Sequence, residues 1–427
     1  MQGIVDLIMK DIVGQPAILV GLIATLGLIL QGKAFADILA GGVKTTVGYL
    51  IITGGAGMVV GVLLNALSPL IQSAFGLVAP AAEAGGIGYA RFLAEWAGYA
   101  TAAVALGFVI NLLLARITPF KYIYLTGHLM IFFAENVFIA FLVGWPSISP
   151  GTLVVITGVI CGVYWTLQPA YMQKLMKGVT GTDDLAFGHT SSFNCWLAAK
   201  LGKFVGSPEE SAEDIELPES LEFFKDTTVS LGFVLGLVTF VVALIAGPSA
   251  AGELSGGQNY IVWALVQGLT FGAGISVMLY GVRMIIGELV PAFRGIAKKL
   301  VPGAKPALDC PIVFPYAPTA VLLGFVGAFA SFMVWMFVFG AVGWGVIIPP
   351  MIMLFFPGGA GGVFGNSTGG WKGAILGGVI CGTLLAFGQL ILGFALQATV
   401  PFYAMEADPD VHILDWIFVQ VSKIFGG

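Results

Sequence analysis

Two polar, glycine-containing stretches in an otherwise apolar chain carry the side chains best suited to bind a hydroxylated ligand. Residues 185–196 read LAFGHTSSFNCW, and residues 364–371 read FGNSTGGW. The hydroxyl and amide groups around His189 and Thr190 suit polyol recognition, and Gly188 lets the backbone approach a ligand closely. The alternative is a helix N-terminus capped by Thr or Ser at a membrane boundary. We expect His189 and Thr190 to bind substrate, and the recurrence predicts a transporter built from two related halves.

Three further ionisable residues lie in apolar surroundings, where a charge is costly and suggests a function. His128 follows a glycine and either faces a ligand or is satisfied between helices. Asp309 stands just before Cys310 and Pro311, so it either accepts hydrogen bonds from a substrate, binds a proton, or caps a broken helix. Glu135 lies in the middle of an apolar run, and its alternative role is to pair with another helix.

Three glycine-rich segments could shape a binding site. Residues 53–57 read TGGAG inside an apolar run, where backbone amides could face a substrate or glycines could allow close helix packing. Residues 83–86 read EAGG and residues 357–362 read PGGAGG. We expect both of these segments to form re-entrant or loop structure.

Several function classes lack support in the sequence. There is no phosphate-binding P-loop, and we find no Ser-His-Asp, HExxH or catalytic cysteine arrangement. The four cysteines are scattered without a CxxC pair, which argues against a metal site. The net charge of −5 argues against a nucleic-acid surface. We therefore expect no self-contained catalytic site, no metal and no cofactor.

The composition predicts a protein embedded in a bilayer. Of the 427 residues, 58% are hydrophobic and 10% are charged, which a water-exposed surface could not accommodate. The apolar runs are continuous rather than alternating, so the spanning segments must be helices and not barrel strands. We predict an all-α polytopic membrane protein with about 10–11 transmembrane helices, re-entrant hairpins and two pseudo-symmetric repeats.

The predicted helices fall into two halves. We expect spans at residues 15–32, 46–66, 97–115, 122–145, 151–171, 227–247, 260–282, 308–342, 343–356 and 373–396. Three prolines predict an irregular start to the segment 308–342. The predicted organisation is a membrane half at 1–206, an acidic linker at 207–225, a second half at 226–400, and at 401–427 either an amphipathic helix or a final span.

Short matches at nearly one offset predict an internal duplication. Residues 45–47 read TTV, and the same letters recur at 227–229, 182 residues later. At this shift residues 126–128 align with 308–310, whereas residues 187–189 align with 364–366 after a slip to 177. Repeats are common in secondary transporters. The number of spans between the copies leaves parallel and inverted halves both open.

Ordered motifs along most of the chain resemble one known family. These are LTGH at 125–128, FGH at 187–189 with Phe193 and Trp196, LDC at 308–310, APTAV at 317–321, and GVF at 362–364 followed by GGW at 369–371. Together they resemble the membrane-embedded C component (EIIC) of the ascorbate-type phosphotransferase system. The resemblance implies a homodimeric bacterial inner-membrane permease that moves sugar by an elevator-like displacement. Soluble EIIB and EIIA components would supply the phosphoryl group.

The resemblance also implies site residues. His128, His189 and Asp309 match substrate-pocket positions, and Gly55 matches a backbone contact. This chain departs from the ascorbate carriers at Ala56, where they place a serine, and at Phe132 and Thr190, where they use glutamines. Residues 84–85 replace their Thr-Tyr pair. The loss of these polar partners predicts a pocket that is not tuned to ascorbate itself.

Together these observations predict an EIIC permease that binds and translocates ascorbate or a related sugar or polyol. The predicted substrate-binding residues are His128, His189, Asp309, Gly55, Ala56, Thr190 and Glu135. One alternative is a proton-coupled secondary transporter that has lost its phosphorylating partners, with Asp309 or His128 carrying the proton. Another is a membrane receptor that binds a ligand without moving it.

Overall fold

The structure is almost entirely helical. The computed structural model describes residues 16–77, 89–215, 226–396 and 407–426. Within these ranges, eight helices are long and apolar enough to cross a membrane, and α2 is a shorter apolar helix. The prediction of an all-α polytopic membrane protein is confirmed.

The elements follow the chain in this order. They are α2 (Pro16–Leu30), α3 (Phe35–Val62), η2 (Leu63–Leu67), α4 (Ser68–Phe75), α5 (Tyr89–Ile117), β1 (Tyr122–Tyr124), α6 (Gly127–Gly144), α7 (Pro150–Thr180), β2 (Ala186–Phe187), α8 (Ser192–Gly202), η3 (Ala212–Asp214), α9 (Thr227–Leu254), α10 (Tyr260–Lys299), β3 (Lys305–Leu308), η5 (Cys310–Tyr316), α11 (Pro318–Val342), α12 (Met351–Leu396) and α14 (Pro409–Gly426).

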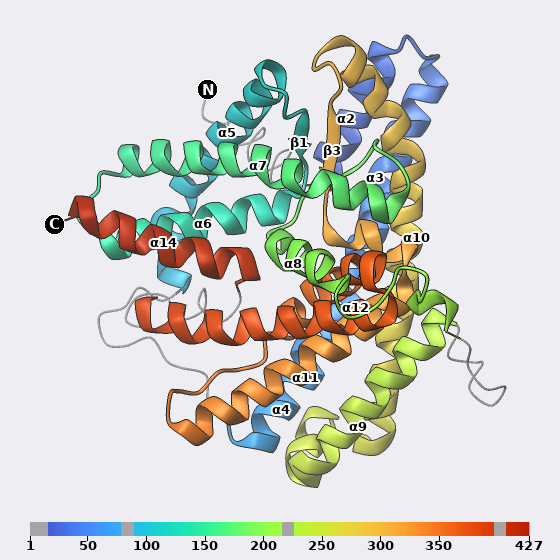
Figure 1. Ribbon diagram of the computed structural model, residues 1–427, viewed down its shortest axis with the longest axis vertical. Coiled ribbons are helices and arrows are strands. Elements are labelled where there is room, and N and C mark those ends of the chain that lie inside the picture. Colours follow the sequence, from blue (N-terminus) through green and yellow to red (C-terminus); the bar gives the residue numbers. More distant parts are fainter. Residues whose placement is uncertain (1–15, 78–88, 216–225, 397–406, 427) are drawn as a thin grey trace.

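The helices form groups on either side of a small sheet. Helices α5, α6, α7 and α14 lie together on one side, and α2, α3 and α10 lie on the other, with β1 and β3 between them (Figure 1). In the first group α5 packs on α7 and α14 packs on α6, while α10 packs on both α2 and α3 in the second. Any residue at the sheet is therefore enclosed by helices from distant parts of the chain.

Three very short parallel strands form this sheet, in the order β1-β3-β2. Tyr124 pairs with Ala307, and Phe187 pairs with Leu308. The β1 and β3 partners are 183 residues apart, one residue from the offset of 182 read from the sequence. The duplication itself stays a prediction, but its two matching segments do lie side by side.

Side-chain amides satisfy the open edges of the sheet. At the β1 edge, Asn111 of α5 accepts a hydrogen bond from Tyr124 N (3.1 Å) and donates one to Tyr122 O (3.1 Å). At the β2 edge, Gln168 of α7 donates to Phe187 O (3.1 Å), and Gln173 donates to Leu185 O (3.0 Å). A strand edge cannot be left unpaired where water is excluded. These buried amides therefore allow a sheet to exist inside a helical membrane protein.

Replacing Asn111 with leucine is expected to destabilise the protein by about 2 kcal/mol or more, because it leaves the Tyr122 carbonyl and the Tyr124 amide buried without a partner. The measurement is the thermal unfolding midpoint of the purified protein in detergent. Leucine at the exposed Asn65 of η2 is the matched control. Equal midpoints for the two variants would contradict this role of Asn111.

An ion pair joins the segment before β2 to the start of β3. Lys305 Nζ lies 2.6 Å from Asp183 Oδ2, and Gln173 donates to Asp183 Oδ1 (2.8 Å). The hydrogen bond from Lys305, with smaller help from Gln173, holds the pKa of Asp183 below its ordinary value. This ion pair joins β2 and β3 near the N-terminal ends of both strands.

The Asp183 pKa shift predicts a pH-dependent contribution to stability. Because the folded-state pKa is lowered, the contribution is complete above the unfolded value of about 3.9. It is lost as the pH falls through the folded-state value. The wild-type protein should therefore have a higher unfolding midpoint than Asp183→Asn at pH 6, and the difference should shrink in acid. A difference that is constant from pH 6 to pH 3 would contradict the prediction.

Helix α12 is a hairpin rather than one straight helix. Gly370 has φ of 60° and ψ of −154°, which breaks the helix and reverses it. The two arms then touch backbone to backbone, since a Cβ added to Gly365 would lie 2.0 Å from the carbonyl oxygen of Gly373. The repeated glycines of this segment therefore allow close contact between the arms. The second polar stretch, residues 364–371, forms the tip of this hairpin.

The C-terminal helix α14 packs on the helical body. Ser422 Oγ donates to Ala140 O of α6 (3.2 Å), and the rings of Phe141 and Phe418 lie 6.1 Å apart. Helix α14 also packs against α12. Residues 401–406 and 427 of the predicted C-terminal segment lie outside the described residues. The N-terminal end of α14 reaches the sheet region, which matters for the site described next.

Candidate functional site

The carboxyl ends of the three strands bring His128, His189 and Asp309 together. Parallel strands end at the same edge of a sheet, so residues that follow them become neighbours. Beyond the strands, Leu125 N donates to Ala307 O (2.9 Å) and Gly188 N donates to Leu308 O (2.8 Å). We call these three residues the strand-end cluster.

Within the strand-end cluster, both imidazoles face the same carboxylate. His128 Nε2 lies 3.5 Å from Asp309 Oδ2, and His189 Nε2 lies 3.4 Å from Asp309 Oδ1. The His189 side chain is 5% exposed, whereas that of His128 is 56% exposed. His189 is thus fixed in the wall of the site, and His128 is its more accessible member.

Neighbouring groups determine where His189 carries its proton when neutral. Ser191 N donates to His189 Nδ1 (3.1 Å), so that nitrogen must present a lone pair. The proton of the neutral ring then resides on Nε2, which faces Asp309. The cluster therefore presents an N–H donor from His189 beside the carboxylate acceptor of Asp309, and this alternation suits the hydroxyl groups of a sugar.

Asp309 serves the local fold as well as the cluster. Its Oδ1 accepts a hydrogen bond from Cys310 N (2.7 Å), which caps η5. A carboxylate has about four lone-pair directions, so this cap leaves capacity for a ligand. Asp309 therefore caps a helix and also lies where it could accept a hydrogen bond from a ligand in the cavity. The irregular start that was predicted for the segment 308–342 corresponds to η5.

Two aspartates at the start of α14 hold the first polar stretch in place. Asp408 accepts a hydrogen bond from Thr190 and has Oδ2 at 3.7 Å from His189 Nδ1. Asp410 accepts hydrogen bonds from Ser192, from Phe193 N (2.9 Å) and from Tyr164 (3.1 Å). The Asp410 carboxylate thereby caps the N-terminus of α8, where negative charge is favourable.

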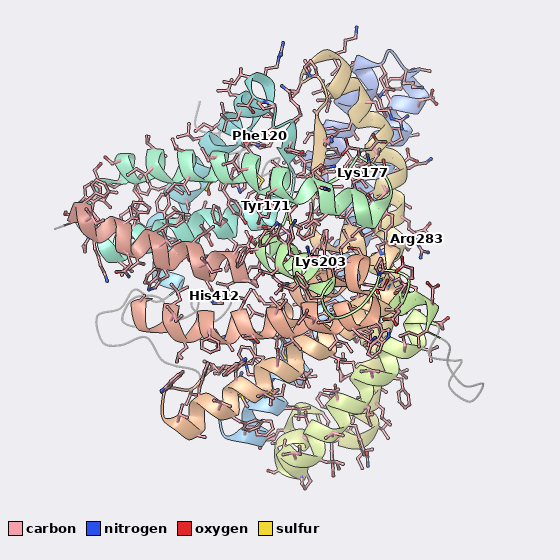
Figure 2. The ribbon with its side chains drawn as sticks, viewed as in Figure 1. Phe120, Tyr171, Lys177, Lys203, Arg283 and His412 are labelled. Atoms are coloured by element: carbon pink, nitrogen blue, oxygen red, sulfur yellow. The ribbon has the colours of Figure 1, made fainter. Side chains whose placement is uncertain are left out.

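The hydroxyl of Tyr171 extends the same network. Figure 2 shows this residue on α7 beside α8, and it is hydrogen-bonded to Ser192.

Sequence reasoning missed both Asp408 and Asp410. The available signal was their DPD spacing at a helix start, where an acidic cap followed by proline is favoured. That signal marks a helix start but does not say which distant segment the carboxylates contact.

The strand-end cluster opens on a cavity of about 440 Å³. Its walls come from α3, α6, α10, η5 and the first arm of α12. Ala56 and Phe132, two positions where the sequence departs from the ascorbate carriers, both line it. Residues 84–85, a third departure, lie outside the described residues.

Three predicted site residues lie outside the cavity lining. Gly55 is buried against α10, where an added Cβ would lie 2.5 Å from Met278 N, as expected for close helix packing. Thr190 is buried and contacts Asp408 rather than the cavity. Glu135 is buried within α6. His128, His189, Asp309 and Ala56 do line the cavity.

The second polar stretch engages the linker and not the cavity. Asn366 Oδ1 accepts a hydrogen bond from Ala212 N (2.8 Å), and Asn366 Nδ2 donates to Ser211 (3.2 Å). Lys372 forms an ion pair with Glu210 at 3.0 Å. The described part of the acidic linker therefore packs along the tip of the α12 hairpin, and the two polar stretches have different roles.

One group of described residues could share a metal ion. Ligand atoms of His189, Asp309 and Cys310 all lie within 4.8 Å of one another. This group overlaps the strand-end cluster, so a cation held there would occupy the space that a sugar hydroxyl would need. The same donors and acceptors therefore serve one ligand at a time.

Comparisons with known proteins show which family the chain belongs to. The chain is 28% identical, over 446 aligned residues, to the ascorbate-specific PTS system EIIC component of Mycoplasma pneumoniae. The match covers 92% of this chain and 66% of that protein, so the chain spans about two thirds of the relative's length. The family model EIIC-GAT, described as the PTS system sugar-specific permease component, matches residues 11–410. The chain belongs to this family of sugar-specific permease components.

Proposed function

We propose that this protein binds ascorbate or a related sugar or polyol and carries it across a bacterial cytoplasmic membrane for phosphorylation. The observation that carries the proposal is the strand-end cluster, a carboxylate between two imidazoles on the wall of a cavity enclosed by membrane helices. Family membership supports the same function. A soluble EIIB component, recharged by EIIA, would supply the phosphoryl group.

In this proposal the residues have distinct roles. Asp309 accepts sugar hydroxyls, His189 and His128 donate to them, and Ala56 contacts the sugar from α3. Thr190 acts through Asp408, while direct contacts by Gly55 and Glu135 stay predictions. The protein would work as a homodimer in lipid, with a substrate-holding core that moves relative to a scaffold. The phosphoryl group would pass from the phosphocysteine of EIIB to a hydroxyl of the sugar, which leaves a free cysteine on EIIB.

One observation favours a second candidate, a proton-coupled transporter. His189 has Asp309 at 3.4 Å from one ring nitrogen and Asp408 at 3.7 Å from the other. Ionisable groups at membrane depth are candidates for proton relays. A proton taken up there could accompany the sugar without any phosphorylating partner.

Uptake by vesicles that contain the purified protein distinguishes the two candidates. We would load the vesicles with EIIB, EIIA, the general phosphotransferase proteins and phosphoenolpyruvate, and then supply labelled ascorbate, hexitols or pentoses. The proposal predicts accumulation of the sugar as its phosphate ester only when the whole phosphoryl relay is present. Accumulation of free sugar that collapses with the proton gradient would support the second candidate instead, and binding with no flux would indicate a receptor.

A further inference from the structure

The cavity lining is mostly apolar, with a small number of polar groups. Its polar groups come mainly from the strand-end cluster, with Tyr49 and Thr53 on α3. The apolar lining positions on three helices are Ile52, Ala56 and Val60 on α3, Val282 and Ile285 on α10, and Ile352, Met353 and Phe356 on α12. A ligand that fills the cavity therefore meets hydrogen-bonding groups at the strand-end cluster, Tyr49 and Thr53, and hydrocarbon at these apolar side chains.

Some of the polar groups in the lining are already engaged. Thr53 Oγ1 donates to Leu50 O (3.0 Å), and Thr126 Oγ1 donates to Gly188 O (2.6 Å). Asp408 accepts from Thr190. The groups left to recognise a ligand are concentrated in the strand-end cluster and at Tyr49.

Among the described residues of the cavity lining, the fixed charges are all negative. Among the described residues, the lining contains Asp309 and Asp408 but neither lysine nor arginine. An acidic group on a ligand would have to be buried next to carboxylates with no fixed cation to pair with, which is unfavourable. Uncharged ligands avoid this cost.

Resting on the proposed function, we infer that the substrate is an uncharged, partly deoxygenated sugar or polyol, such as a 6-deoxyhexose or its alditol. Its hydroxylated edge lies against the strand-end cluster, and its deoxygenated edge lies against the apolar side chains of α3, α10 and α12. A hydroxyl pressed against that wall would lose water without gaining a partner. An additional hydroxyl there is expected to weaken binding on the order of tenfold or more.

Matched pairs of ligands test the inference on the purified full-length protein. We would measure thermal stabilisation and dissociation constants for L-fucose against L-galactose, L-rhamnose against L-mannose, L-fucitol against galactitol, and ascorbate as the anionic probe. The expected result is tighter binding of the deoxy member in at least one pair and weaker binding of ascorbate. If each parent sugar binds at least as tightly as its deoxy partner, or ascorbate binds most tightly, the inference fails while the proposed function stands. If no compound in the panel binds, both are contradicted.

A single hydroxyl added to the wall provides a second test. Ala56→Ser places an oxygen on the α3 side of the cavity with little steric change, and one hydrogen bond alters affinity by roughly three- to tenfold. The variant should shift the affinity ratio toward the fully hydroxylated parent by that factor. Ala102→Ser, at an exposed position on α5, is the matched control and should leave the ratio unchanged. An Ala56→Ser protein with the wild-type ratio would contradict the placement of the deoxygenated edge.

Discussion

Replacing Asp309 with asparagine is expected to weaken sugar binding by about 10- to 100-fold while the protein stays folded. Hydrogen bonds to a charged group contribute about 1.5–3 kcal/mol, and the amide cannot accept at both terminal atoms as the carboxylate does. Asparagine still caps η5, because its oxygen can accept from Cys310 N as Asp309 does at 2.7 Å. The measurement is the dissociation constant of the best ligand by titration calorimetry.

Asp214→Asn is the matched control for this substitution. Asp214 is exposed at the end of η3 and does not line the cavity, so its variant should bind like the wild type. His189→Ala should resemble Asp309→Asn, because it removes the donor that faces the same carboxylate. Wild-type affinity in both Asp309→Asn and His189→Ala would show that the strand-end cluster does not bind the sugar.

Replacing Asp410 with alanine is expected to lower the stability of the protein by at least about 2 kcal/mol and to weaken binding as well. The carboxylate accepts from Ser192, Phe193 N and Tyr164, and each buried donor left without a partner costs about 1–3 kcal/mol. Loss of the cap would also release the segment that carries His189. The measurements are the unfolding midpoint and the dissociation constant of each variant.

Asp410→Asn separates the cap from a general effect of the position. Asparagine retains one acceptor oxygen, so its variant should lie between the wild type and Asp410→Ala in both measurements. If the alanine variant is as stable as the wild type, Asp410 does not hold α8. If it is destabilised but binds normally, α14 supports the fold without positioning the site.

Long apolar runs predicted most of the long helices. The span predicted at 343–356 is wrong, because residues 345–350 are not helical and α12 begins at Met351. The span predicted to start at residue 260 begins at Tyr260 in α10, where Asn259 caps the first turn by accepting from Ile261 N (3.1 Å). Its end was placed too early, at residue 282, because α10 continues to Lys299 through a mixed polar segment. Hydropathy marks where a chain can be buried in lipid, and a helix can extend beyond that point.

The small sheet could not be predicted from the sequence. Strands β1, β2 and β3 have 3, 2 and 4 residues, too few to show an alternating pattern. Their pairing joins segments far apart in the chain, such as Phe187 and Leu308. The amides that cover the edges, including Asn111, look in the sequence like ordinary polar residues in a helix.

The site was predictable only in part. Spacing in the sequence marked His128, His189 and Asp309 separately as ionisable groups in apolar surroundings, and the family resemblance linked them. Asp408 was missed because its role depends on where α14 packs, and no local pattern encodes that contact. Asn366 of the second polar stretch accepts a hydrogen bond from Ala212 N and does not line the cavity, a difference from His189 that the recurrence in the sequence does not show.

The position of a bound ligand tests the central claim most directly. An experimental structure of the protein with its tightest-binding sugar should show hydroxyl oxygens within about 3 Å of the Asp309 carboxylate and of Nε2 of His128 or His189. The deoxygenated edge should face Ile285 and Phe356. A sugar bound elsewhere, for example beside Glu135 or at the tip of the α12 hairpin, would contradict the account.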